Sequence, residues 1–247
     1  MTKPILIIHP KDKTTRFLDK IKNHLLHEFD GKIHHFNIQF TDLSHIQCLD
    51  RIQEHPDNGL IIFLGHGRSN ALSGSCSPNY DSLMVSLDAE IENPEILYGK
   101  EIFIDEQNVD VFRNKNVFCL ACNSNDKIAK QAIEKGANCF FGFGDIPTSN
   151  AEFVALGELD KKISLSRITK EMKSEINYII KRSLEIGIKK SLTFKELKEI
   201  MRFIVNQRIA DVLVNKKDLK ERRIIADYLY FFKRDMKLWG DGSVRLS

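Results

Sequence analysis

The sequence predicts an α/β fold, in which a mostly parallel β-sheet is flanked by helices and followed by a helical elaboration. Short apolar runs alternate with amphipathic helical stripes over the first 150 residues. Several of these runs are apolar throughout, which is typical of strands buried on both faces. From about Ala151 onward, longer helical periodicities replace the alternation. Alternating strands and helices favour a parallel sheet, because parallel neighbours need a crossover helix between them.

The elements of the first part follow in order. Strands are predicted at 4–9, 35–40, 60–65, 117–121 and 139–143. Helices are predicted at about 15–29, ending at Gly31, and at about 126–135, ending at Gly136. A stripe of Leu43, Ile46, Leu49 and Ile52 predicts a further helix that stops before Pro56.

The interval 68–116 interrupts the alternation of strands and helices with a Ser-, Asn- and Gly-rich stretch and the strand-like LMVSLD and EIFID. A connection of this length within a compact α/β domain more often has a function than not.

The second part predicts three long helices. The first covers 167–185, with Ile168, Met172, Ile176, Ile179 and Ile180 along one face. Thr193 and Glu196 have capping-box spacing and open the second, which carries Leu197, Ile200, Phe203, Ile204 and Val212. The third covers 219–233 and bears the aromatic cluster YLYFF. We therefore expect an α/β core at 1–150, a helical elaboration at 151–235, and an extended segment at 236–247 that packs back on the core.

Composition excludes several classes of protein. Lys and Arg number 37 against 34 Asp and Glu, which is too balanced for a dedicated nucleic-acid binder. Nucleic acid is therefore expected only indirectly, through a partner. Five scattered cysteines, an odd number, argue against a disulfide framework and indicate a reducing compartment. Neither a secretory leader nor an apolar run of membrane-spanning length is found, so we expect a cytoplasmic protein without membrane contact.

Two strand ends carry residues of catalytic type. The run LIIFLGHGRSN places His66 between two glycines, and NVFCLACNSND places Cys122 after a small alanine. Reactive groups of parallel α/β sheets collect beyond the carboxyl ends of the strands. If the two strands are neighbours, their ends bring His66 and Cys122 together.

A cysteine and a histidine in this arrangement suit nucleophilic catalysis. An imidazole keeps the thiol deprotonated for attack on a carbonyl carbon and then protonates the leaving amine. Because Gly67 has no Cβ, its backbone amide can approach the substrate closely. A helix that starts just after Cys122, capped by Asn123 or Ser124, would direct the positive end of its dipole at the sulfur. This chemistry needs no cofactor, and no cluster of Cys or His completes a zinc site.

The order strand-His-Gly, strand-Ala-Cys, helix, Gly-Ala and a further apolar strand resembles the caspase-like cysteine peptidases. Cys122 follows His66 by 56 residues, similar to the roughly 50-residue spacing of caspases. The likeness is greatest to the bacterial CHAT proteases and gingipains, through GANCFFGFG and the late turn LWGDGSVRL. It covers Pro4 to about Thr148 and returns at Met236 to Leu246, which implies a caspase-hemoglobinase-like three-layer sandwich.

The resemblance implies a cytoplasmic endopeptidase that cleaves protein substrates. His66 and Cys122 would form the dyad, and the amides of Gly67 and Cys122 the oxyanion hole. This chain has GDIPTS where relatives carry a Trp-Asp and then a Thr-Asp pattern. Asp145 would face the first specificity pocket and favour a basic substrate residue before the cleaved bond (P1), and Arg68 would contact substrate. The caspase pentapeptide around the nucleophile is absent, so aspartate specificity is not implied. Relatives of the CHAT type are commonly governed by a sensor, which implies a separately encoded regulatory partner in antiviral defence or programmed death.

Two other functions stay open at this point. The same strand ends would serve a catalytically silent binding or regulatory module that holds a ligand or a protein. Cys119 and Cys122 also form a Cys-x-x-Cys, the spacing of redox proteins. Because side chains alternate along a strand, residues three apart point to opposite faces unless a turn begins between them. Cys119 is embedded in VFCLA, which favours a place in the core instead.

Overall fold

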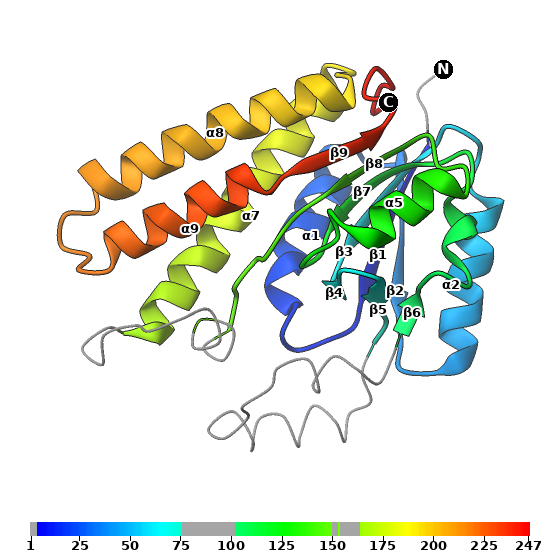
Figure 1. Cartoon of the computed structure of the whole chain (residues 1–247), viewed down its shortest axis with the longest axis horizontal. Helices are drawn as coiled ribbons and strands as arrows, with labels where there is room; N and C mark the ends of the chain where they lie inside the picture. Colours follow the sequence, from blue (N-terminus) through cyan, green and yellow to red (C-terminus); the bar gives the residue numbers. More distant parts are fainter. Residues whose placement is uncertain (1–3, 76–101, 150–152, 154–163) are drawn as a thin grey trace.

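The computed structural model describes residues 4–75, 102–149, 153 and 164–247. Its centre is a six-stranded sheet in the order β2-β1-β3-β7-β8-β9 (Figure 1). All neighbouring pairs are parallel except β8 and β9. The predicted α/β class, with a mostly parallel sheet and a helical C-terminal part, is confirmed.

The strands that form the central sheet are β1 (Ile5–Pro10), β2 (Ile33–Ile38), β3 (Leu60–Leu64), β7 (Asn116–Leu120), β8 (Cys139–Gly142) and β9 (Lys237–Gly240). A small antiparallel sheet follows β3 directly and contains β4 (Gly67–Arg68), β5 (Ala71–Ser73) and β6 (Ile102–Ile104). The predicted EIFID strand is therefore found in β6. The strand-like LMVSLD lies outside the described residues, as does Cys76.

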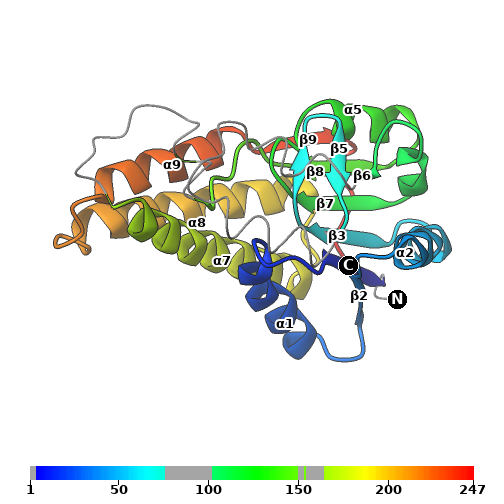
Figure 2. The ribbon, with the colours of Figure 1, turned by 90° about the horizontal axis from the view of Figure 1, so that it is seen from below.

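Helices cover both faces of the central sheet (Figure 2). One face carries α1 (Asp19–Glu28) and α7 (Leu165–Lys189), together with α8 (Phe194–Val214) and α9 (Arg222–Arg234). The other face carries α2 (Asp42–Glu54) and α5 (Lys127–Glu134). Short 3-10 turns, η1 (Arg16–Leu18) and η2 (Val109–Phe112), complete these layers. The arrangement is a three-layer sandwich, and the described helices all belong to its outer layers.

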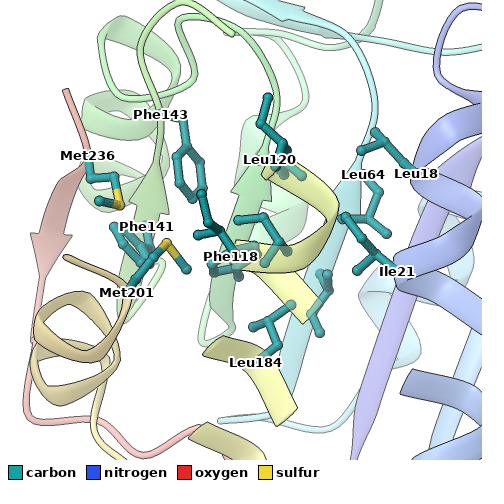
Figure 3. Close-up of a cluster of buried hydrophobic side chains, with 14 of the residues drawn as sticks. Leu18, Ile21, Leu64, Phe118, Leu120, Phe141, Phe143, Leu184, Met201 and Met236 are labelled. Carbon is teal, nitrogen blue, oxygen red and sulfur yellow. The ribbon is translucent and has the colours of Figure 1, made fainter. Parts of the chain in front are cut away.

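The helical part shares one hydrophobic core with the sheet. Phe118, Phe141 and Phe143 are fully buried and lie on one face of β7 and β8, where α7 and α8 supply Leu184 and Met201 (Figure 3). The Phe143 ring also stacks on Phe232 of α9, with centroids 5.1 Å apart. Because this cluster is continuous from α1 to α9, the C-terminal helices stabilise the sheet directly.

Some of the predicted elements needed correction. The second strand is Ile33–Ile38, not 35–40, and Phe40 is exposed. Helix α2 buries Ser44, Cys48 and Ile52, while Leu43 and Ile46 of the predicted apolar stripe are 64% and 56% exposed. The small side chains of Ser44 and Cys48 allow the helix to lie close to the sheet. Phe203, one of the apolar residues that the second predicted helix carries, is exposed on α8.

Other sequence signals behave as expected. Thr193 and Glu196 form the predicted capping box at the start of α8. Gly136 has a φ of 103°, a left-handed conformation that glycine adopts readily after a helix. Met236 and the residues after it return to the sheet, where β9 pairs with β8. Among the described helices, none has an apolar stretch long enough to cross a lipid bilayer.

A buried ion-pair network joins α7 to α8. The Glu175 carboxylate is 1% exposed and accepts two hydrogen bonds from the Arg208 guanidinium, at 2.6 and 2.9 Å. Lys216 Nζ donates a third, at 2.9 Å. A charge so far from water needs such partners, because desolvation would otherwise be too costly. The network therefore fixes how α7 and α8 pack against each other.

We predict that Glu175→Ala lowers the free energy of unfolding by about 2 kcal/mol, because it leaves two cations without their buried partner. Arg208 and Lys216 are partly exposed and can turn toward water, which keeps the loss below that of a fully buried pair. Urea denaturation measures the change. The exposed Glu134, paired with Lys130 at 3.7 Å, is the matched control, and Glu134→Ala should cost less than about 0.5 kcal/mol. Equal losses in the two variants would contradict a special role for Glu175.

Candidate active site

The pairing of β3 with β7 brings His66 and Cys122 to the same place. Leu64 lies opposite Leu120 in this parallel pair, and the Gly65 amide donates to the Leu120 carbonyl at 3.2 Å. His66 and Cys122 each lie two residues beyond that register pair. Both line one small cavity of about 20 Å³ at the carboxyl end of the sheet. The two residues that the sequence singled out therefore meet at neighbouring strand ends.

The loop that follows β1 holds the His66 ring. Its Nε2 lies 2.5 Å from the Thr14 hydroxyl oxygen and 3.3 Å from Oδ2 of Asp12. Asp12 Oδ1 accepts hydrogen bonds from the Thr14 amide and hydroxyl, both at 2.6 Å. The Asp12 side chain is only 5% exposed. This carboxylate is therefore built into the site and fixes the orientation of the imidazole.

These contacts decide which ring nitrogen carries the proton. A carboxylate only accepts hydrogen bonds, so the single Thr14 hydroxyl hydrogen is donated to Asp12. The Thr14 oxygen must then accept from His66, which places a proton on Nε2. Nδ1 is the remaining ring nitrogen, and in the neutral imidazole it is the basic one.

The electrostatic balance at Asp12 favours its charged form. Burial alone would raise the pKa of this carboxyl, but the hydrogen bond and charge of His66, with the two hydrogen bonds from Thr14, outweigh burial and hold the pKa well below its usual range. Asp12 is therefore negatively charged at neutral pH.

Asp12 and Thr14 are site residues that the sequence reasoning missed. They lie in the segment KDKTT, which was interpreted only as a polar turn after the first strand. A signal for them exists, because β1 is a neighbour of β3 and its carboxyl end meets the same edge of the sheet. An acidic residue two positions after such a strand is a candidate partner for a histidine on the next strand.

Cys122 lies in a tight loop after β7. Its Sγ donates to the Ile146 carbonyl across 3.7 Å, and the side chain is half-buried. The following Asn123 has a φ of 52°, a left-handed conformation that turns the chain sharply. The buried Ser124 hydroxyl donates to the Cys119 carbonyl and accepts from the Phe143 amide. The loop is thus fastened to both β7 and β8.

The expected helix start beside the sulfur is wrong. Helix α5 begins at Lys127, and its N-cap position is Asp126, which makes no side-chain capping bond. Asn123 and Ser124 are not caps, because their side chains bind Asp145 and the Cys119 carbonyl instead. Any stabilisation of a Cys122 thiolate must therefore come from His66 and nearby amides rather than from the dipole of α5.

The other predicted site residues lie around this loop. Gly67 packs against the Cys122 strand end, since a Cβ at this position would be 2.9 Å from the Ala121 Cβ and 3.1 Å from the Cys122 carbonyl oxygen. Asp145 follows β8 and accepts a 2.7 Å hydrogen bond from the Asn123 side chain. Arg68 is half-buried in β4, paired with Ala71 of β5.

Cys119 and Cys122 lie on opposite faces of the sheet. Cys119 is fully buried in the cluster that contains α2 and α5, whereas Cys122 packs against the cluster that contains α1 and α7. Neither forms a disulfide bond. Burial raises the pKa of the Cys119 thiol well above its usual range. This separation disfavours a redox pair.

Comparisons with known proteins do not add a relative. A scan against protein-family models, a search of curated proteins and a search of solved structures each found no match. Within the described ranges, no group of three or more His, Cys, Asp or Glu side chains is arranged to hold a metal ion. The class is therefore defined by geometry, as an α/β protein with cysteine, histidine and aspartate at three adjacent strand ends.

We predict that Asp12→Asn destabilises the protein at pH 7 by about 1–2 kcal/mol, because the buried His66 and Thr14 lose a charged acceptor. The folded protein holds the Asp12 proton less tightly than the unfolded chain does. Its contribution is therefore full at neutral pH and is lost as pH falls below about 4, where the unfolded carboxyl takes up a proton. Denaturant titrations of both proteins between pH 7 and pH 2 measure this.

The exposed Asp50 on α2 is a suitable control, and Asp50→Asn should leave the stability nearly unchanged at every pH. A stability gap between the Asp12→Asn variant and the original chain that stayed constant down to pH 2 would contradict the lowered pKa of Asp12.

Proposed function

We propose that this chain is a cysteine peptidase of the caspase-like kind, which cleaves protein substrates with Cys122 as nucleophile and His66 as general base and acid. The observation that supports it most directly is that His66 and Cys122 line the same cavity. In addition, Asp12 and Thr14 contact Nε2 of His66 and orient the ring. This arrangement has the three parts of an activated nucleophile: the attacking group, its base and a residue that orients the base.

In the proposed reaction, the Cys122 proton moves to Nδ1 of His66 and the thiolate attacks the scissile carbonyl carbon. The tetrahedral intermediate collapses as the imidazolium gives its proton to the leaving amine, and a thioester on Cys122 remains. Water then attacks the thioester and gives one proton to His66. The acid product leaves, and the proton returns to the sulfur. Atoms and charge balance without any cofactor.

Asp12 is a positioning residue in this proposal. Its negative charge would stabilise the imidazolium that forms when Cys122 loses its proton, and its contact with Nε2 fixes the orientation of the ring. The amides of Gly67 and Cys122 are the proposed donors to the oxyanion, and the close approach of the two strand ends supports their convergence.

The proposal also includes restraint of the peptidase by a separate protein. A cytoplasmic peptidase needs restraint, and the resemblance to CHAT-type proteins favours a separately encoded sensor or regulatory partner. Protein cleavage in defence or programmed death is the corresponding biological role. Both statements stay predictions from the resemblance.

We predict that peptidyl acyloxymethyl ketones, which are thiol-reactive electrophiles, label the purified protein at Cys122. The reagents vary in the residue next to the reactive ketone (P1). His66→Gln should slow labelling by about 100-fold or more, because the general base is lost. Asp12→Asn should slow it by about tenfold, because the imidazolium is less stable. Mass spectrometry of tryptic peptides identifies the labelled cysteine and measures the rate.

The other cysteines provide the controls. Burial raises the pKa of Cys48 to about 12 and raises those of Cys119 and Cys139 still further, so they should stay unlabelled. A Cys76→Ser variant removes the cysteine outside the described residues. If Cys122 reacts no faster than a free peptide thiol and His66→Gln changes nothing, the peptidase proposal is wrong, and a catalytically silent binding module takes its place.

A further inference from the structure

The turn between α8 and α9 lies at the end of the helical part that is remote from the central sheet (Figure 1, Figure 2). The stretch 213–223, which we call the helical tip, covers the end of α8, this turn and the start of α9. It carries five lysines and arginines against two acidic residues. Its net charge of +3 equals the formal charge of the whole chain, so positive charge is concentrated at this end.

Ion pairs join the helical tip to α7. Lys216 Nζ donates to the Glu171 carboxylate at 2.6 Å and to the Glu175 carboxylate at 2.9 Å. Glu221 is buried, and its carboxylate lies 3.7 Å from the Arg167 guanidinium at the start of α7. The first turns of α7 and the helical tip therefore lie together, and their exposed side chains belong to one surface.

The exposed charges of this surface are mostly positive. Asp218 is the one exposed acidic side chain of the helical tip. The tip and the first turns of α7 together expose five basic side chains: Lys217, Lys220, Arg223, Arg167 and Lys170. Clusters of about four to eight lysines and arginines beside apolar groups are typical of proteins that bind anionic lipid headgroups. The charge of this surface is therefore complementary to an anionic bilayer.

Two aliphatic side chains are exposed directly before these cations. Leu213 and Val214 are the last two residues of α8, and they are 39% and 59% exposed. Aliphatic side chains next to cations suit the surface of a bilayer, because the aliphatic groups enter the boundary of the acyl chains while the cations meet the phosphates. The exposed Leu213 and Val214 thus give the helical tip the apolar part of such a surface.

The same cations would also attract the phosphates of nucleic acids, but the side chains between them favour lipid. Proteins that bind single strands place aromatic rings beside the cations, on which the bases stack. The stretch 213–223 contains no aromatic residue. Exposed leucine and valine side chains gain nothing from phosphates, whereas transfer from water into the lipid boundary stabilises them.

We propose that the helical tip docks on the surface of a membrane that contains anionic lipids. The sequence led us to expect no membrane contact, because no apolar run is long enough to cross a bilayer, but binding at the surface needs no such run. The residues that line the cavity of His66 and Cys122 do not include any of the helical tip. Docking therefore leaves this cavity free, and the proposal does not rest on the peptidase function.

The first test is sedimentation of the purified full chain with vesicles of phosphatidylcholine, either alone or mixed with phosphatidylserine. Binding to the mixed vesicles should be at least about tenfold tighter and should weaken with salt. Lys217→Glu/Lys220→Glu should reduce it at least about tenfold. Arg51→Glu/Lys130→Glu makes the same charge change at exposed positions of α2 and α5 and should have little effect. Equal losses in the two double variants, or no binding by the original chain, would overturn the proposal.

The second test separates lipid from nucleic acid. Leu213→Ser/Val214→Ser should weaken binding to the mixed vesicles at least about fivefold, because the aliphatic groups no longer enter the lipid boundary. The control Leu43→Ser removes an exposed leucine of α2 and should change nothing. Because all these positions are exposed, the urea midpoints of the variants should match that of the original chain. Vesicle binding unchanged by the double serine variant, or binding of the helical tip to a DNA oligonucleotide but not to vesicles, would show that the membrane proposal is wrong.

Discussion

The parallel pairing of β3 with β7 is the constraint on which the site depends. Leu64 and Leu120 lie opposite each other in this pair, so the residues two positions further on leave the sheet side by side. A shift of one residue would exchange the two faces of a strand and bury the wrong side chains. Because both strands are fully buried between the two hydrophobic clusters, a shifted register would require both clusters to repack. The energy that fixes the site therefore comes from the hydrophobic core.

Each of four neighbouring strand ends provides a different part of the site. The loop after β1 provides Asp12 and Thr14, β3 provides His66, β7 provides Cys122, and β8 provides Asp145. Each group is polar, yet each sits on the end of a strand whose buried part is apolar. The polar groups satisfy one another: Asp12 with Thr14 and His66, and Asp145 with Asn123. Such mutual pairing allows a buried charge to persist at the edge of an apolar core.

Reasoning from the sequence predicted the features that depend on hydrophobic periodicity. It missed those that depend on contacts between residues far apart in the chain. The buried strands and the meeting of His66 with Cys122 follow from apolar runs and the rule that reactive groups collect at strand ends. The face of α2 was wrong because Leu43 and Ile46 look more apolar than Ser44 and Cys48, although the smaller pair lets the helix approach the sheet. Asp12 was missed because a polar turn gives no local sign of the histidine that it meets.

Two hydrogen bonds of Asn125 join the Cys122 loop to a segment that is synthesised much later. Asn125 donates to the Asp235 carbonyl, and its own carbonyl accepts from the Trp239 indole at 2.9 Å. Both partners are made by the ribosome more than 100 residues after Cys122. A nascent chain that already contains His66 and Cys122 therefore lacks these two hydrogen bonds to the Cys122 loop. The loop of Cys122 gains both hydrogen bonds only when translation has passed residue 239, so its final geometry depends on the completion of the C-terminal helices.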